Sequence, residues 1–292
     1  MHKSGFVNII GNPNVGKSTL MNALVGEKLS IITSKAQTTR HRIMGIVSGE
    51  DFQIVYSDTP GILKPSYKLQ ESMMKFVTGA VTDADVILYV TDTVEQGDRS
   101  AEIIGRIRES GIPTVVVINK IDLSTPEALD ALVDKWRQEL PEAQIVPASA
   151  KENFNIEGLF KTILALLPEG PAFYPKETLT DKTLRFFASE IIREKILKFY
   201  DKEIPYCCEI EIDSYREEPT IDRIAATIYV ARDSQKGILI GHKGEKLKRV
   251  GQTAREDMEE FLGKKVFLQL FVKVSDDWRN NERQLRRFGY EL

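Results

Sequence analysis

Apolar runs alternate with helix-length segments through the first half of the chain. The runs are rich in β-branched residues and read FVNIIG, FQIVYSD, DVILYVTD, PTVVVINK and AQIVPAS. Runs that are apolar at consecutive positions are typical of strands buried on both faces, and amphipathic spacers of this length predict crossover helices. The first half therefore predicts an α/β domain, a mostly parallel sheet with helices on both faces.

The second half follows a different pattern. The segment TLRFFASEIIREKILKFYD has apolar positions at helical spacing, and two β-rich segments of similar length follow it, YCCEIEIDSY and RIAATIYVAR. Two further helical patterns flank the tetrapeptide GHKG, and KVFLQLFVKV alternates with the period of a strand. We expect an α+β domain with the order α-β-β-α-α-β. Its first helix carries an apolar stripe expected to pack in the core, made of Phe186, Phe187, Ile191, Ile192, Ile196 and Phe199.

Between the halves, three prolines and Gly170 interrupt any regular element. We therefore predict domains at residues 1–170 and 181–292, joined by a linker at 171–180. A length of 292 residues suits two domains.

Composition excludes several classes of protein. The chain is 42% hydrophobic and 28% charged with a net charge of -3, as in ordinary soluble proteins. No apolar run approaches the roughly 20 residues of a membrane span, and the start MHKSG lacks the regions of a signal peptide, so we expect a cytoplasmic protein. The only cysteines, Cys207 and Cys208, are adjacent, which suits neither a disulfide framework nor a metal site. We interpret them as core thiols in a strand.

A glycine-rich segment follows the first apolar run and opens a helical pattern. It fits G-x-x-x-x-G-K-S/T, in which main-chain N–H groups converge on phosphate oxygens. The lysine supplies charge to the β and γ phosphates, and the serine hydroxyl can bind Mg²⁺. The motif alone does not choose between ATP and GTP. Its predicted nucleotide-binding residues are Gly11, Asn12, Pro13, Asn14, Val15, Gly16, Lys17, Ser18 and Thr19.

Three later segments, each ending a predicted strand, favour GTP. The first, DTPG, can place a carboxylate in the Mg²⁺ shell and a glycine N–H at the γ-phosphate. The second, NKID, offers a buried aspartate to the two donors of guanine, and adenine has no such pair. The third, ASA, can offer main-chain N–H groups to guanine O6. The predicted nucleotide-binding residues of these segments are Asp58, Thr59, Pro60, Gly61, Asn119, Lys120, Ile121, Asp122, Ser149 and Ala150, together with Ile62, which directly follows DTPG.

This motif order predicts a GTPase, because ligands of open α/β sheets bind at the carboxyl ends of the strands. Lys17, Gly61 and Mg²⁺ would stabilise the charge that develops on the transferred phosphoryl group. Many GTPases have a glutamine where this chain has Ile62, which can orient no water, so we expect slow turnover. The first switch is predicted at Gln37, Thr38, Thr39, Arg40 and His41, the alternative being an ordinary polar loop.

The tetrapeptide GHKG predicts a second site. A GXXG loop lets a nucleic-acid backbone approach closely, and an adjoining apolar groove can accept single-stranded bases. With the I-G-x-x-G form, the element order and the local positive charge, this half resembles a type II KH domain that binds RNA. The alternative is a helix junction with a solvated basic face. The candidate RNA-binding residues are Ile240, Gly241, His242, Lys243, Gly244, Lys246, Lys248 and Arg249.

The combination of GNPNVGKS, QTTRH, DTPGI, NKID and ASA with RFFASEIIREKIL and GHKG resembles the Era family of bacterial GTPases over essentially the whole chain. The resemblance implies GTP/GDP-controlled binding near the 3′ end of 16S ribosomal RNA during 30S subunit assembly, with peripheral membrane association and a monomeric state. It also implies Thr39, rather than Thr38, as the third Mg²⁺ ligand beside Ser18 and Asp58. Asn14 matches a P-loop asparagine that helps bind K⁺ in related GTPases, so we hypothesise modest K⁺ stimulation.

Two other functions stay open at this point. The chain could be an RNA-binding assembly factor in which GTP is structural, or a GTPase subunit of a tRNA-modifying enzyme. The second is disfavoured, because the chain has no spare domain for that chemistry and no evident catalytic cysteine.

Overall fold

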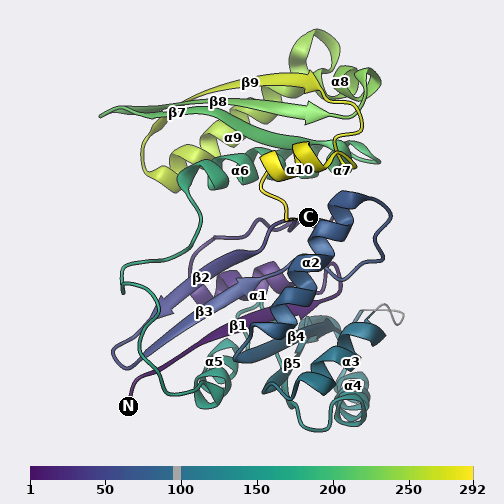
Figure 1. Ribbon diagram of the computed structural model, residues 1–292, viewed down its shortest axis with the longest axis vertical. Coiled ribbons are helices and arrows are strands. Elements are labelled where there is room, and N and C mark those ends of the chain that lie inside the picture. The colour runs from purple at the N-terminus through teal and green to yellow at the C-terminus, as the bar shows by residue number, and fades with distance from the viewer. Residues whose placement is uncertain (95–99, 292) are drawn as a thin grey trace. The chain divides into compact units, whose positions relative to one another are not determined.

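The computed structural model describes residues 1–94 and 100–291 and divides into two compact units (Figure 1). The first unit comprises Met1–Ser66 and Met73–Asp181, and the second comprises Tyr67–Ser72 and Lys182–Leu292. Each unit is described by itself. Within the described residues, no helix has the length and apolar character needed to cross a membrane.

The first unit is built on a six-stranded sheet with the order β2-β3-β1-β4-β5-β6. All neighbouring strands are parallel except β2 and β3. The strands are β1 Lys3–Gly11, β2 Ile43–Ser48, β3 Phe52–Asp58, β4 Val86–Asp92, β5 Thr114–Asn119 and β6 Gln144–Pro147. The predicted mostly parallel α/β fold is confirmed. The antiparallel edge strand β2 was not among the predicted strands.

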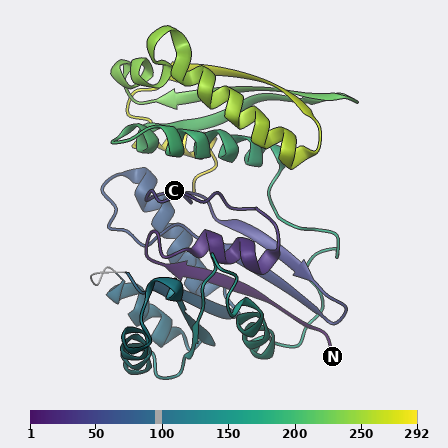
Figure 2. The ribbon, with the colours of Figure 1, turned by 180° about the vertical axis from the view of Figure 1, so that it is seen from behind.

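Helices cover both faces of this sheet (Figures 1 and 2). Helices α2, α3 and α4 pack on β4 and β5 through one buried apolar cluster. Val77 of α2, Ile103 of α3 and Trp136 of α4 belong to this cluster. Helices α1 and α5 lie on the other face, seen in front in Figure 2. The helices are α1 Lys17–Val25, α2 Lys68–Thr82, α3 Ala101–Ser110, α4 Pro126–Glu139 and α5 Ile156–Leu166, with a 3-10 turn, η1, at Ile121–Leu123.

The segment predicted as a linker packs on the first unit. The Ile46 N–H donates to the Leu179 carbonyl at 2.8 Å, and the Thr180 hydroxyl donates to the Met44 carbonyl at 2.6 Å. Buried Gln53 accepts hydrogen bonds from the N–H groups of Phe173 and Tyr174. These contacts cover the open edge of β2, which would otherwise present unpaired main-chain groups.

The second unit contains a three-stranded sheet with the order β7-β8-β9, antiparallel between β7 and β8 and parallel between β8 and β9. Two long helices, α6 and α9, pack on one face of it (Figure 2). The predicted element order is confirmed, with two short helices in addition. The elements are α6 Leu184–Phe199, α7 Ile204–Cys207, β7 Glu209–Glu217, β8 Ile221–Val230, α8 Asp233–Ile240, η2 His242–Gly244, α9 Glu245–Leu262, β9 Lys265–Val274 and α10 Glu282–Arg287.

The core of this unit contains most of the predicted stripe of α6. Ile192 and Ile196 are fully buried in it, and Phe199 is partly buried against it. Both cysteines are buried and unbridged, as predicted, but their placement in a strand is wrong. Cys207 ends α7 and Cys208 precedes β7, because Pro205 in the first turn starts a short helix there.

Candidate functional site

The glycine-rich segment forms a tight turn between β1 and α1. Gly11 ends β1, and a Cβ added there would lie 2.1 Å from the Val90 carbonyl oxygen. Gly16 caps α1 with φ of 94°, and a Cβ there would lie 2.3 Å from the amide nitrogen of Asn119. Only glycine fits either position, so the loop backbone is held close to the neighbouring strands.

Lys17 lies over this loop as the first residue of α1. It is only 6% exposed, and its ammonium donates to the carbonyl oxygens of Gly11 at 3.0 Å and Asn12 at 2.8 Å. The positive charge therefore sits inside the turn, at a helix N-terminus whose main-chain N–H groups also favour an anion. This arrangement suits phosphate.

Three oxygen side chains from separate elements converge beside the loop. The Ser18 hydroxyl donates to Asp58 Oδ2 at 2.7 Å and lies 2.9 Å from the Thr39 hydroxyl, which is 3.3 Å from the same carboxylate oxygen. Thr38 lies elsewhere, with its hydroxyl donating to the Lys35 carbonyl at 2.6 Å. The structure therefore groups Thr39, and not Thr38, with Ser18 and Asp58.

Asp58 ends β3 and is completely buried, and its second oxygen, Oδ1, has no hydrogen-bond partner among the described residues. Burial raises the pKa of the Asp58 carboxyl, while the Lys17 ammonium and the hydroxyl donors oppose that shift. An unsatisfied buried carboxylate oxygen beside two hydroxyls fits Mg²⁺, which prefers oxygen ligands and keeps few protein ligands when it binds with phosphates. Within the described ranges, no group of three or more His, Cys, Asp or Glu side chains could hold another metal.

The DTPG segment passes directly under the glycine-rich loop. The Thr59 hydroxyl donates to the Ile9 carbonyl at 2.7 Å, and buried Pro60 follows it. A Cβ on Gly61 would lie 2.8 Å from Pro13, so Gly61 brings bare main chain against the loop. Ile62 is 3% exposed and packs in the apolar cluster under α2 and α3.

Asn119 joins three parts of the site. Its amide donates to the Val15 carbonyl at 2.8 Å, and its side-chain oxygen accepts from the Ala150 N–H at 3.0 Å. Next to it, the Lys120 ammonium donates to the Asn14 carbonyl at 2.5 Å and pairs with Asp92 at 2.6 Å. Hydrogen bonds from Asn119 and Lys120 of NKID therefore connect the glycine-rich loop to the carboxyl ends of β5 and β6.

The residues predicted for the base subsite have hydrogen-bond partners within the protein. Asp122 is exposed rather than buried, with one carboxylate oxygen accepting from the Ser149 hydroxyl at 2.6 Å. The Ser149 N–H donates to the Phe154 carbonyl at 3.1 Å, and the Ala150 N–H donates to Asn119 Oδ1 at 3.0 Å. The carboxyl ends of β5 and β6 still bring Asp122 and Ser149 together, as predicted.

A cavity of about 440 Å³ opens between the glycine-rich loop and the segment predicted as the first switch. Its walls include Gln37, Thr38 and Thr39, while Arg40 is buried and His41 stacks near Phe76 at a ring distance of 6.5 Å. Sequence reasoning missed other lining residues. These are Ile31, Ile32, Thr33 and Lys151.

A signal existed for some of the missed residues. Lys151 directly follows ASA, and Asp92 ends an apolar strand as Asp58 does, so both could have been named from position. Residues 31–33 have no such signal, because their place depends on how the loop folds back over α1.

In the second unit, the GHKG tetrapeptide forms the turn between α8 and α9. Gly241 and Gly244 have φ of 73° and 82°, and Lys243 between them has φ of 49°. His242 and Lys243 are exposed, as are Lys246, Lys248 and Arg249 in the first turns of α9. The Arg249 guanidinium lies 4.1 Å from the centre of the Phe199 ring. Ile240, at the end of α8, is half-buried, so the turn presents bare backbone beside cations and apolar surface.

The two units define a P-loop GTPase that carries a KH domain. Family models agree: one described as 50S ribosome-binding GTPase matches residues 6–120, and one described as KH domain matches residues 203–279. The GTPase Era of Alkaliphilus metalliredigens (strain QYMF) is 46% identical over 295 residues, covering 99% of each chain. The GTPase Era of Staphylococcus haemolyticus (strain JCSC1435) is 45% identical, covering 99% of this chain and 97% of the relative. The chain belongs to the Era family of GTPases.

Two solved structures resemble the whole chain. One is Era in complex with MgGDPNP and nucleotides 1506–1542 of 16S ribosomal RNA, with a TM-score of 0.96, 41% identity and complete coverage of both chains. The other is a variant of Aquifex aeolicus Era bound to GDP·AlF4⁻, with a TM-score of 0.95 and 41% identity, covering 99% of this chain and 100% of that one.

Proposed function

We propose that this protein binds GTP with Mg²⁺, hydrolyses it slowly, and binds 16S ribosomal RNA near its 3′ end during assembly of the 30S subunit. The observation that carries the proposal is the match over the full chain to Era bound to both MgGDPNP and that RNA. The loop around Lys17 and the oxygen cluster at Asp58 supply the phosphate and metal sites that this function needs.

The residue roles follow from the geometry. The turn from Gly11 to Thr19 holds the phosphates, and Lys17 stabilises negative charge that develops in the transition state. Ser18, Thr39 and Asp58 would hold Mg²⁺, which would supply positive charge to the phosphate oxygens. Gly61 offers its N–H to the γ-phosphate, since no side chain screens it. Asp122 accepts from guanine.

A low intrinsic rate follows from Ile62. Its side chain is buried in an apolar cluster and has no group to orient water, so the attacking water must be positioned in another way. Asn14 is exposed at the tip of the loop in a left-handed conformation, with φ of 66°, where its side chain can reach a cation beside the phosphates. We expect modestly faster hydrolysis in K⁺ than in Na⁺ buffer, and equal rates would remove this role.

Single-turnover hydrolysis of GTP, measured with and without the RNA of nucleotides 1506–1542, tests the proposal. Slow turnover that changes when RNA is added supports a regulatory GTPase. No turnover under either condition would favour the alternative, an RNA-binding assembly factor in which GTP is structural.

We also propose that the protein works in the cytoplasm as a monomer, where its RNA partner is assembled. Any membrane contact would be peripheral, and it is implied by family resemblance only. Co-sedimentation with anionic vesicles tests that contact, and sedimentation velocity tests the monomer.

A further inference from the structure

The outer face of the second sheet, opposite α6 and α9, carries two exposed phenylalanines on the edge strand β9. Val266 is buried, and Leu268 and Leu270 are partly buried against the core. Residues 265, 267, 269, 271 and 273 alternate with these and are all exposed, so they share the other face. Phe267 is 42% exposed and Phe271 is 49% exposed. Two exposed rings on one regular face are unusual and indicate a binding surface.

The neighbouring strand adds a cation and small side chains. Arg223 is the register partner of Phe267, with its guanidinium 5.4 Å from the ring centre. Ala225 and Thr227 are the partners of Gln269 and Phe271. Because these side chains are small, the Phe271 ring stands above the sheet surface. We call the set Arg223, Phe267, Gln269, Phe271 and Lys273 the aromatic platform.

The C-terminal segment covers the adjoining part of the same face. The Phe288 ring packs on Tyr229 at 5.3 Å between ring centres, and Arg287 pairs with Glu211 at 2.6 Å. Asp213 accepts from the Thr227 hydroxyl at 2.7 Å. Glu211 and Asp213 of β7 are therefore engaged within the protein. Arg223 pairs with Glu218 at 3.0 Å but stays exposed, as Lys273 does, on the face that carries the two rings.

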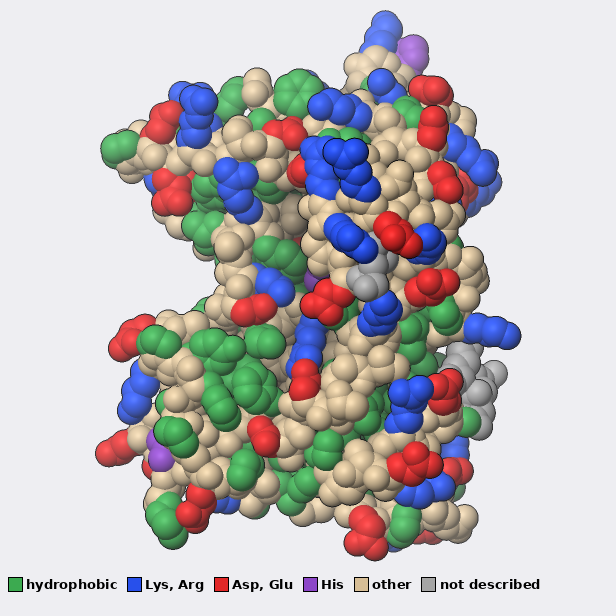
Figure 3. Space-filling model, viewed as in Figure 1, with side chains coloured by type: hydrophobic (Ala, Val, Ile, Leu, Met, Phe, Trp, Pro, Cys, Tyr) green, Lys and Arg blue, Asp and Glu red, His purple; other side chains and the backbone are tan. Residues whose placement is uncertain are grey.

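Figure 3 shows green hydrophobic side chains beside blue Lys and Arg side chains on this view of the second unit. Exposed aromatic rings with flanking cations complement an RNA strand, because bases stack on rings while cations meet phosphates. The surface of an apolar protein partner would not complement the flanking positive charges. The chemistry of the platform therefore favours RNA.

We propose that the aromatic platform is a second RNA-binding surface of this unit, on which bases next to the GXXG-bound segment stack. This inference rests on the proposed function. A GXXG loop clamps about four nucleotides, whereas the related Era was crystallised with nucleotides 1506–1542, a much longer RNA. Contact with more of that RNA than the nucleotides at the turn would require further protein surface, and sheet aromatics in other RNA-binding folds stack two or three bases.

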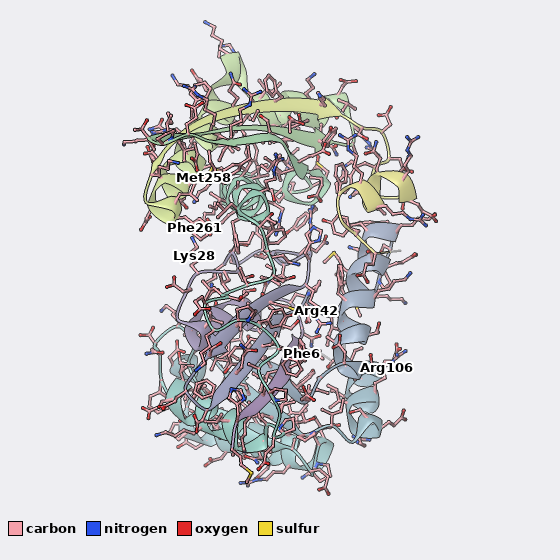
Figure 4. The ribbon with its side chains drawn as sticks, turned by 60° about the vertical axis from the view of Figure 1, so that its left-hand side comes forward. Phe6, Lys28, Arg42, Arg106, Met258 and Phe261 are labelled. Atoms are coloured by element: carbon pink, nitrogen blue, oxygen red, sulfur yellow. The ribbon has the colours of Figure 1, made fainter. Side chains whose placement is uncertain are left out.

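The test compares two RNAs on the full chain, by fluorescence anisotropy of labelled RNA. The long probe has the sequence of nucleotides 1506–1542 of 16S ribosomal RNA. The short probe is a 3′ fragment of the same RNA. It is the shortest fragment whose binding is still weakened by substitution of Gly241. Three double variants at Phe267 and Phe271 carry Ala, Leu or Tyr. Phe261→Ala is the matched control, an exposed phenylalanine on α9 (Figure 4).

We expect the Ala and Leu variants to bind the long probe about 10- to 100-fold more weakly, since stacking on each ring is lost. The Tyr variant and Phe261→Ala should bind it as the parent does, and the short probe should bind all variants equally. The proposal would be overturned if the Ala variant bound the long probe as tightly as the parent does. It would also be overturned if the Leu variant kept full binding, because that result would indicate a surface that needs only apolar side chains, as in contact with a protein. A parent protein that binds neither probe would instead overturn the proposed function.

Discussion

At the scale of single residues, Asp122 is the residue proposed to select the base. We expect Asp122→Asn to lower GTP affinity by at least about 100-fold and to raise affinity for xanthosine triphosphate, because an amide cannot accept from both guanine donors. Competition between the two nucleotides for a fluorescent analogue measures the change. Asp134→Asn, on exposed α4 of the same unit, is the control. Unchanged GTP selectivity would contradict the role of Asp122.

Thr38 and Thr39 form a matched pair for testing the metal site. Thr39→Val keeps the shape of the side chain and removes the hydroxyl that lies beside Ser18 and Asp58. We expect it to weaken Mg²⁺-dependent binding of a GTP analogue about tenfold or more, since one oxygen ligand is lost. Thr38→Val should have a smaller effect, because its hydroxyl bonds within the loop. Mg²⁺ titrations of analogue binding compare the two, and equal losses would argue against the assignment.

At the scale of elements, the sequence predicted the strands and motifs whose signals are local. The five apolar runs became strands, and burial on both faces explains the consecutive apolar residues of the four inner ones, β1, β3, β4 and β5. β2 was missed because it is a short edge strand interrupted by Gly45, and its pairing with β3 and residues 179–180 depends on distant parts of the chain. The hydrogen bond from Ser149 to Asp122 could not be predicted either, since it joins residues 27 apart in the sequence.

One interaction links the end of the first switch to the end of α2. Arg42, which directly precedes β2, donates to Ser57 Oγ at 2.5 Å, to Asp83 at 2.5 Å and to Asn8 Oδ1 at 3.0 Å (Figure 4). Asn8 is fully buried and its amide also donates to Asp83 at 2.6 Å. Arg42 therefore satisfies a buried acceptor on β1 and connects the start of β2 to Asp83, the residue after α2.

We expect Arg42→Ala to lower the free energy of unfolding of the first unit by about 1–3 kcal/mol, because the buried Asn8 oxygen loses its donor. Asp83→Ala should cost less, about 0–1 kcal/mol, since that carboxylate is half-exposed. Urea unfolding can be followed in a Trp278→Phe background, where Trp136 is the remaining tryptophan and reports this unit. A larger loss at Asp83 than at Arg42 would contradict the argument.

At the scale of the whole molecule, the change of pattern near residue 180 revealed two units, but it did not reveal where the connecting segment packs. Gln53 and the edge of β2 hold residues 173–181 on the first unit. Those partners lie more than 100 residues away in sequence, so composition could show only that the segment has no regular structure.

The two units are expected to bind different ligands, RNA in the second unit and GTP in the first. Gly241→Asp together with Gly244→Asp should weaken RNA binding at least about 100-fold, because added carboxylates meet the phosphate backbone where the turn approaches it. GTP affinity should stay unchanged, since the nucleotide site lies wholly in the first unit. Anisotropy with labelled RNA and a labelled GTP analogue measures both affinities.

The matched control is Gly263→Asp, at the end of α9. Its left-handed conformation, with φ of 61°, resembles that of Gly244, and a Cβ there meets nothing within 4 Å. The substitution therefore carries backbone strain like that at Gly244 without touching the turn. If Gly263→Asp loses RNA binding as the loop variant does, strain in the unit explains the loss and the GXXG turn is not the site. If only the loop variant loses RNA binding and that variant still binds GTP, then the second unit makes the RNA contact and the first unit makes the nucleotide contact.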